Sequence, residues 1–209
     1  MYRDGSIRKY LDDAAAGIPA PGGGSVSAFA GALATTMGSM AANFTVGKKK
    51  FLEVEPRVKS ILARLDRGRE TLLELMDRDV EAYGVVSAAY RMPRETTEEK
   101  TARTAKIQEA LVVAMDVPLR TVRACLDVLR ELAQLVDIAN PNLISDVGVS
   151  AILAEAALRG AKLNVEINLV SLKDEALARQ TRAEVEGAEV EGARILCEVL
   201  TKVGAKMTS

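Results

Sequence analysis

Pro19-Ala-Pro-Gly-Gly-Gly-Ser25 leads directly into a run of mostly small residues, Val26-Ser-Ala-Phe-Ala-Gly-Ala-Leu-Ala-Thr-Thr-Met-Gly-Ser-Met-Ala-Ala-Asn43. Three consecutive glycines before a helical pattern allow positive φ angles and leave several N–H groups exposed at a helix start. The helix macrodipole favours an anion or an electron-rich ring at that point. The stretch therefore predicts a binding loop and then a helix from about Ser25, its expected N-cap, to about Gly47.

Small residues recur at helical spacing along this helix, at Gly31, Ala34, Gly38 and Ala42. Residues of this size let a neighbouring helix approach closely. We therefore expect this helix at the centre of a bundle.

The rest of the chain has the same helical character, because apolar residues recur at spacings of three and four and aromatic residues make up only 3%. Pro118 is expected either to kink a helix or to start another one. Further helices are expected at about Ile7–Ala16, Glu55–Tyr90, Thr96–Asp116, Leu119–Ile138, Ser145–Leu169 and Lys173–Val203. Gly17 is the expected C-cap of the first of these helices, Thr96 and Glu99 form a capping box, and Ser145 is an expected N-cap. The pattern predicts an all-α, antiparallel bundle of about six to seven helices that forms a single domain over residues 1–209.

Composition excludes several functions. The 28 basic and 29 acidic residues give a net charge of −1, so no nucleic-acid partner is indicated. No run approaches the roughly 20 apolar residues of a membrane span, and the first residues lack the apolar core of a secretory signal, so we expect a cytoplasmic protein without membrane contact.

Cys125 and Cys197 are far apart in helical patterns and are expected to be buried thiols. Histidine is absent, so proton transfer must use Asp, Glu, Lys, Tyr, Cys or water.

The glycine run matches neither common phosphate motif. A Walker loop and a dinucleotide fingerprint both follow a strand, and Gly47-Lys48 is succeeded by Lys49 rather than by Ser or Thr. As a bare motif, Pro-Gly-Gly-Gly-Ser is equally typical of a tight turn.

Two interpretations stay open for Lys48, Lys49 and Lys50. They form either a solvated cationic cap on a helix C-terminus or a docking point for substrate carboxylates.

Asp77 and Asp79 lie in the middle of a long amphipathic pattern whose expected buried stripe contains Ile61, Leu65, Leu72, Leu75, Met76, Val80 and Tyr83. On a helix, Asp79 shares a face with Met76 and Tyr83, so at least one carboxylate points toward apolar surroundings. Desolvation there would raise its pKa, which suits a group that holds and delivers protons. The alternative is an ordinary surface carboxylate.

Polar residues form a last cluster, Asn140, Ser145, Asp146, Asn164 and Asn168. Asn164 and Asn168 are four apart in a mostly apolar stretch, and a buried amide needs hydrogen-bond partners. One interpretation is a turn of paired amides that face a cleft. The other is helix capping by Asn140 and Ser145 and core hydrogen bonding by the others.

Taken in order, these motifs resemble the formiminotransferase-cyclodeaminase C-terminal family. The resemblance rests on Pro-Gly-Gly-Gly-Ser-Val-Ser-Ala, the Gly-Lys-Lys exit, the segment from Asp79 to Tyr83, Pro93 followed by Thr97-x-Glu99-Lys100, and Ser145-Asp146 to Asn164-Val-x-x-Asn168-Leu. It covers essentially the whole chain, although the formiminotransferase domain of the bifunctional members is absent.

The resemblance implies an all-α homodimer that binds a tetrahydrofolate derivative, possibly polyglutamylated, without metal or any other cofactor. It makes Asp79 the catalytic acid or base. It implies a folate cleft formed by Gly22, Gly23, Gly24, Ser25, Asn43, Lys48, Lys49, Asn140, Asp146, Asn164 and Asn168.

Two reactions fit this resemblance. In a cyclodeaminase, N10 of 5-formiminotetrahydrofolate attacks the formimino carbon, and Asp79 protonates the departing ammonia to leave 5,10-methenyltetrahydrofolate. In a methenyltetrahydrofolate cyclohydrolase, Asp79 activates water and the ring opens to 10-formyltetrahydrofolate. We expect the cyclodeaminase first and the cyclohydrolase second. A third hypothesis, from another class, is a folate-binding helical dimer without activity.

Overall fold

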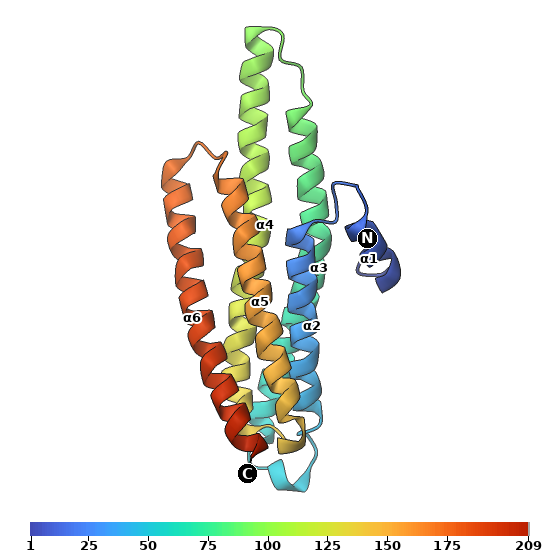
Figure 1. The fold of residues 1–209 in the computed structure, drawn as a ribbon, viewed down its shortest axis with the longest axis vertical. Helices are drawn as coiled ribbons and strands as arrows, with labels where there is room; N and C mark the ends of the chain where they lie inside the picture. The colour runs from blue at the N-terminus through green and yellow to red at the C-terminus, as the bar shows by residue number, and fades with distance from the viewer. Residues whose placement is uncertain (209) are drawn as a thin grey trace.

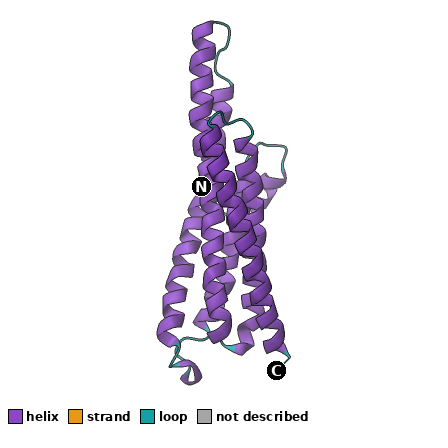
Figure 2. Ribbon diagram, turned by 90° about the vertical axis from the view of Figure 1, so that its left-hand side faces the viewer, coloured by secondary structure: helices purple, strands orange, loops and turns teal. Residues whose placement is uncertain are grey.

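The computed structural model describes residues 1–208, which form six α-helices and two short 3₁₀ helices and contain no strand (Figure 2). The helices lie along one long axis, apart from the short first one, which packs at the side of the bundle (Figure 1). Their bounds are α1 Ile7–Ala15, α2 Gly23–Asn43, η1 Lys49–Phe51, α3 Glu55–Tyr90, α4 Thr97–Ile138, η2 Pro141–Leu143, α5 Ile144–Leu169 and α6 Glu175–Met207. The predicted all-α bundle is confirmed.

Helix α2 packs against α3, α4 and α5. Its glycines explain the close packing. A Cβ atom on Gly31 would lie 2.9 Å from the Cys125 sulfur, and one on Gly38 would lie 2.9 Å from a Leu132 methyl carbon. Both distances are shorter than van der Waals contact, so larger residues would push the helices apart. The prediction that small residues allow close helix packing is confirmed, but α2 is not at the centre, because α4 contacts four helices and one side of α2 is exposed.

Helices α3 and α4 form a long antiparallel hairpin whose connected ends project beyond the other helices (Figure 1). The Thr96 hydroxyl accepts a hydrogen bond from the Glu99 N–H, and the Glu99 carboxylate accepts from the Thr96 N–H, as the capping box predicts. Pro118 lies inside α4, which continues unbroken to Ile138. The expected helix end near Asp116 is therefore wrong.

Three other sequence-based expectations about helix ends are wrong. Helix α2 begins at Gly23, so Ser25 lies inside it and Gly22 is the N-cap. Leu143, rather than Ser145, precedes α5, and Ala16, rather than Gly17, is the C-cap of α1. Neither Gly22 nor Leu143 makes a side-chain cap hydrogen bond, and the Ala16 N–H donates to the Asp13 carbonyl.

Two expectations about burial also fail. Tyr83, which was expected in the buried stripe, is 44% exposed. Cys197 is exposed, whereas Cys125 is buried in the core, where desolvation raises the pKa of its thiol to about 12. Within residues 1–208, no helix is both long enough and apolar enough to cross a bilayer.

Candidate active site at the start of helix α2

A cleft of about 330 Å³ lies between the N-terminus of α2 and the helices α3, α4 and α5. The sequence 19–23 forms one wall, and the C-terminal part of α5 forms the opposite wall. The lining residues are Pro19, Ala20, Gly22, Gly23, Asp79, Ala82, Tyr83, Val86, Ala114, Asn164, Ile167 and Asn168. Asp79 is the one carboxylic acid among these described lining residues, and none of them is basic.

Asp79 on α3 points at the first turn of α2. Its Oδ2 accepts a hydrogen bond of 2.9 Å from the Ser25 N–H. Burial raises the pKa of the Asp79 carboxyl, and the Ser25 N–H opposes this by stabilising the charged form. Burial is the larger effect, so the pKa lies above that of an ordinary aspartate. The predicted role, a carboxyl that can hold and deliver a proton, therefore has a physical basis.

Gly24 makes this contact possible. A Cβ atom at position 24 would overlap the Asp79 carboxyl, whereas a Cβ on Gly22 would meet no atom within 4 Å. Gly23 is a third case, because its Cβ would press on the Asn164 amide at 3.1 Å. Glycine is therefore required at these three consecutive positions to different degrees. Gly24 and Gly23 leave room for two polar side chains of the cleft.

Ser25 and Tyr10 support the turn from behind. The two hydroxyl groups share a hydrogen bond of 3.0 Å, and both side chains are buried. Burial is the main cause that raises the pKa of the Tyr10 hydroxyl, which keeps it protonated at neutral pH. Sequence reasoning missed Tyr10. The available signal was that it is an aromatic residue on a short helix directly before the glycine run.

Asn164 and Asn168 present carbonyl oxygens to the cleft. The Asn164 Nδ2 donates to the Gly160 carbonyl at 2.9 Å, and the Asn168 Nδ2 donates to the carbonyls of Asn164 at 2.8 Å and Ala114 at 3.1 Å. Their amino groups are therefore occupied by backbone acceptors. The two Oδ1 atoms have no hydrogen-bond partner among residues 1–208 and remain available to N–H donors of a ligand.

Pro118 explains the contact between Asn168 and Ala114. In an α-helix, the carbonyl of residue 114 accepts from the N–H of residue 118, which proline lacks. The Asn168 amide donates to this freed carbonyl from the neighbouring helix. The same bond satisfies a carbonyl of α4 and holds a side chain that lines the cleft.

Asp77, two residues before Asp79, serves another purpose. It is 6% exposed, and its Oδ1 accepts a hydrogen bond of 2.7 Å from the Tyr2 N–H. Arg3 lies 3.6 Å from its other oxygen. Asp77 therefore holds the N-terminal segment against α3 and does not line the cleft.

The remaining predicted residues lie at the other end of α2. Helix α2 has 21 residues, so its two ends are about 30 Å apart at 1.5 Å per residue. The Asn140 amide donates to the Phe44 carbonyl at 3.2 Å, and the Asn140 Oδ1 accepts from the Asn142 N–H. The residues at this distal end are Asn43, Lys48, Lys49, Asn140 and Asp146. One chain therefore does not bring the twelve predicted site residues into one cleft.

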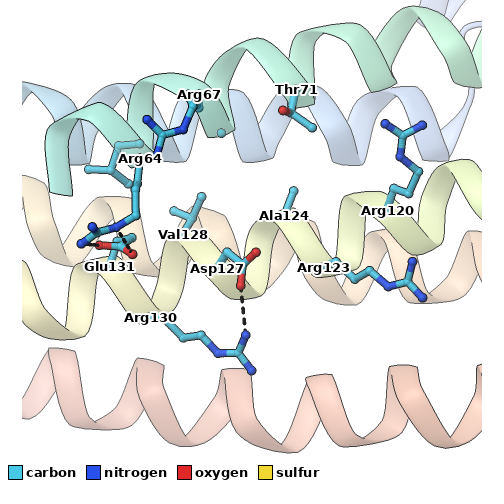
Figure 3. A pocket seen from close by; sticks show the side chains of 12 residues that line it. Arg64, Arg67, Thr71, Arg120, Arg123, Ala124, Asp127, Val128, Arg130 and Glu131 are labelled. Atoms are coloured by element: carbon cyan, nitrogen blue, oxygen red, sulfur yellow. Dashed lines mark hydrogen bonds and ion pairs between the residues drawn. The ribbon is translucent and has the colours of Figure 1, made fainter. Parts of the chain in front are cut away.

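A larger groove of about 660 Å³ runs between α3 and α4 and is rich in arginine (Figure 3). Several of these arginines are paired. Arg64 contacts Glu131, and Arg130 contacts both Asp127 and Glu191 of α6. The Arg64–Glu131 and Arg130–Glu191 pairs join neighbouring helices, and the carboxylates that line this groove are occupied by arginines. We therefore place the candidate active site in the smaller cleft.

Residues 1–208 contain no group of three or more His, Cys, Asp or Glu residues arranged to hold a metal ion.

Comparisons with known proteins identify a family and relatives that match most of the chain. A family model described as formiminotransferase-cyclodeaminase matches residues 6–187. The methenyltetrahydrofolate cyclohydrolase of Methylorubrum extorquens is 42% identical over 208 residues, which cover 99% of this chain and 100% of the relative. The formimidoyltransferase-cyclodeaminase of Rattus norvegicus is 31% identical over 182 residues, which cover 87% of this chain and 34% of that protein. This chain thus spans about a third of the rat protein.

A solved structure has the same fold. The crystal structure of formiminotetrahydrofolate cyclodeaminase from Thermotoga maritima superimposes with a TM-score of 0.86 at 32% sequence identity, and the match covers 96% of each chain. The likeness therefore extends over the whole bundle, including both ends of α2.

Proposed function

This chain belongs to the formiminotransferase-cyclodeaminase family, and we propose that it hydrolyses 5,10-methenyltetrahydrofolate to 10-formyltetrahydrofolate. The observation that carries this proposal is the partly buried Asp79 carboxyl of α3, which lies against the first turn of α2 in the cleft that Asn164 and Asn168 also line. The end-to-end match with a named cyclohydrolase favours this reaction. It reverses the order that the sequence motifs suggested, in which the cyclodeaminase came first.

Asp79 acts as both base and acid in this mechanism. The methenyl carbon belongs to a cationic amidinium, whose charge stabilises the Asp79 carboxylate and so opposes the effect of burial on its pKa. The carboxylate takes a proton from water as the new C–O bond forms at the methenyl carbon. Asp79 then returns that proton to N5 as the C–N5 bond breaks. The hydroxyl of the tetrahedral intermediate releases its own proton to solvent as the formyl C=O forms.

The cleft has groups that suit a reduced pterin. The Asn164 and Asn168 carbonyl oxygens can accept hydrogen bonds from ring N–H groups. The first N–H bonded within α2 is that of Val26, which leaves the Gly23 N–H for an acceptor on the ligand. Ala82, Val86 and Ile167 give the ring apolar contacts. The folate derivative is the substrate, and we propose no other cofactor.

The second candidate is the cyclodeaminase reaction on 5-formiminotetrahydrofolate. The whole-chain structural likeness to a cyclodeaminase supports it. Here Asp79 is the acid that protonates the departing ammonia after N10 attacks the formimino carbon. The cleft and the catalytic residue are the same, so geometry alone favours neither reaction.

A direct comparison of substrates tests the proposal. The purified protein is given 5,10-methenyltetrahydrofolate, and the loss of methenyl absorbance is followed against the spontaneous rate. In parallel it is given 5-formiminotetrahydrofolate, and released ammonia is measured. We expect hydrolysis to have the higher kcat/KM. Faster ammonia release would instead assign the cyclodeaminase reaction, and folate binding without either turnover would leave a non-catalytic binding protein.

We also propose that the chain works as a homodimer. The exposed faces of α2 and α5 are apolar, and they supply the surface through which two copies associate.

A further inference from the structure

The first turn of α2 follows three glycines, and it makes the backbone contact to Asp79. Glycine loses more backbone freedom on folding than any other residue, so this turn needs support from outside its own helix. The first N–H bonded within α2 is that of Val26. The Ser25 N–H therefore has no acceptor in its own helix and donates to the Asp79 carboxylate instead. The position of Ser25 decides how well that bond is made.

Tyr10 of α1 supplies support from outside α2. Its hydroxyl lies 3.0 Å from the Ser25 hydroxyl, and the two residues are 15 positions apart in the chain. Tyr10 is 3% exposed and Ser25 is fully buried. Among residues 1–208, neither hydroxyl has another hydrogen-bond partner. Each hydroxyl therefore depends on the other, because a buried hydroxyl without a partner is unfavourable.

The Tyr10 ring is itself held in place. Tyr10 is the buried residue of α1, and its ring packs edge-on against Tyr2 and Phe29, with centroid distances of 5.2 and 5.3 Å. Leu75 and Met76 of α3 belong to the same apolar cluster. A rigid ring that is packed on several sides keeps its hydroxyl at one place relative to α3, which carries Asp79.

We propose that Tyr10 is a positioning residue for the proposed reaction: its hydroxyl fixes Ser25, and Ser25 in turn presents its N–H to the Asp79 carboxyl. Tyr10 does not line the cleft, so it acts through the turn and not on the substrate. The proposal rests on the proposed function, because that function makes Asp79 the catalytic group. Loss of the Tyr10 hydroxyl should therefore affect kcat more than KM.

The pKa of Asp79 gives this role a signature. The Ser25 N–H stabilises the charged carboxyl, so a looser turn weakens that bond and raises the pKa of Asp79 further. The nearby titratable groups are Tyr83 on the same helix, Tyr10, and Asp77, which binds the N-terminal segment. The lining residues from the segment 19–22 and from α2, α4 and α5 carry no titratable group.

A matched pair of variants tests the inference. Tyr10→Phe removes the hydroxyl and keeps the ring, whereas Tyr2→Phe removes the neighbouring hydroxyl, which donates to Asp13. In a carboxyl ¹³C NMR titration without substrate, Tyr10→Phe should raise the midpoint of Asp79 by about half a pH unit or more. With 5,10-methenyltetrahydrofolate, it should lower kcat about tenfold at nearly constant KM. An unchanged Asp79 midpoint in Tyr10→Phe, or an equal shift in Tyr2→Phe, would overturn the proposal.

A double variant separates positioning from stability. Ser25→Ala keeps the N–H but removes the hydroxyl, so it should match Tyr10→Phe in both measurements. Combining the two substitutions leaves no buried hydroxyl without a partner, so the Tm should recover in part. The kcat should stay at the level of Tyr10→Phe, because the turn still lacks its support. Recovery of kcat together with Tm would contradict a positioning role. Absence of turnover in wild type would contradict only the proposed function, since the Asp79 titration needs no substrate.

Discussion

Asp79 is subject to two opposing effects on its carboxyl group. Burial disfavours the charged form, and the Ser25 N–H at the start of α2 favours it. Burial is the larger effect, so the folded protein holds this proton more tightly than the unfolded chain does. Ionisation of Asp79 therefore lowers the free energy of unfolding, whereas ionisation of a salt-bridged aspartate raises it.

This sign predicts a pH-dependent difference in stability. Below the ordinary pKa of aspartate, Asp79 is protonated in both states and carries no penalty. As the pH rises through the raised pKa of the folded state, the folded protein loses stability relative to an Asp79→Asn variant. Thermal unfolding followed from acidic to neutral pH should show Asp79→Asn gaining stability over wild type. A difference that is constant with pH, or that falls, would show that burial does not control this carboxyl.

The sequence predicts the positions of some site residues but not of others. The family resemblance, rather than spacing alone, predicted Asp79, Gly23 and the two asparagines in one cleft, and the structure places them together. The contact between Tyr10 and Ser25 joins segments that only the fold brings together. Ser25 was wrongly predicted as a cap, because its preference for N-cap positions was outweighed by glycines that start the helix earlier.

The first turn of α2 gives a prediction at the scale of a helix. Gly24→Ala adds a Cβ that displaces the Asp79 carboxyl, and Gly22→Ala adds the same atom into open space. A misplaced catalytic group costs on the order of 10²-fold in rate. Steady-state kinetics should therefore show a large fall in kcat for Gly24→Ala and little change for Gly22→Ala. Equal activity of the two variants would mean that Asp79 need not sit against this turn.

Helix α4 gives a second prediction, through Pro118 and Asn168. Pro118→Ala restores an N–H that can bond the Ala114 carbonyl, so the Asn168 amide loses a fixed partner. The variant should unfold at a higher temperature, because proline is unfavourable inside a helix, and its KM should rise several-fold. In a double-mutant cycle with Asn168→Ala, the two effects on KM should not add. Additive effects would mean that Pro118 does not act through Asn168.

Sequence patterns could not decide between a kink and a new helix at Pro118. The answer depends on whether another helix supplies a donor for the freed carbonyl, which is a property of the packed bundle. The capping box at Thr96, by contrast, involves residues three apart and was predicted correctly. Local signals thus fixed helix starts only where the partners are close in sequence.

For the whole molecule, the main difference from the sequence-based expectation is the distance between the two groups of predicted site residues. The motifs predicted one folate cleft, but the bundle separates them by the length of α2. The exposed apolar stripes on α2 and α5 are the feature from which an association can be inferred.

The most direct measurement is the turnover of Asp79→Asn beside Asp77→Asn, with substrate affinity determined for both. The two substitutions are the same chemical change, two residues apart, but Asp77 faces the N-terminal segment. Asp79→Asn should lower kcat by roughly 10²-fold or more while substrate still binds, because the amide cannot transfer the proton. Asp77→Asn should keep most of its kcat. Near-normal turnover by Asp79→Asn would contradict the assignment of this carboxyl as the catalytic group.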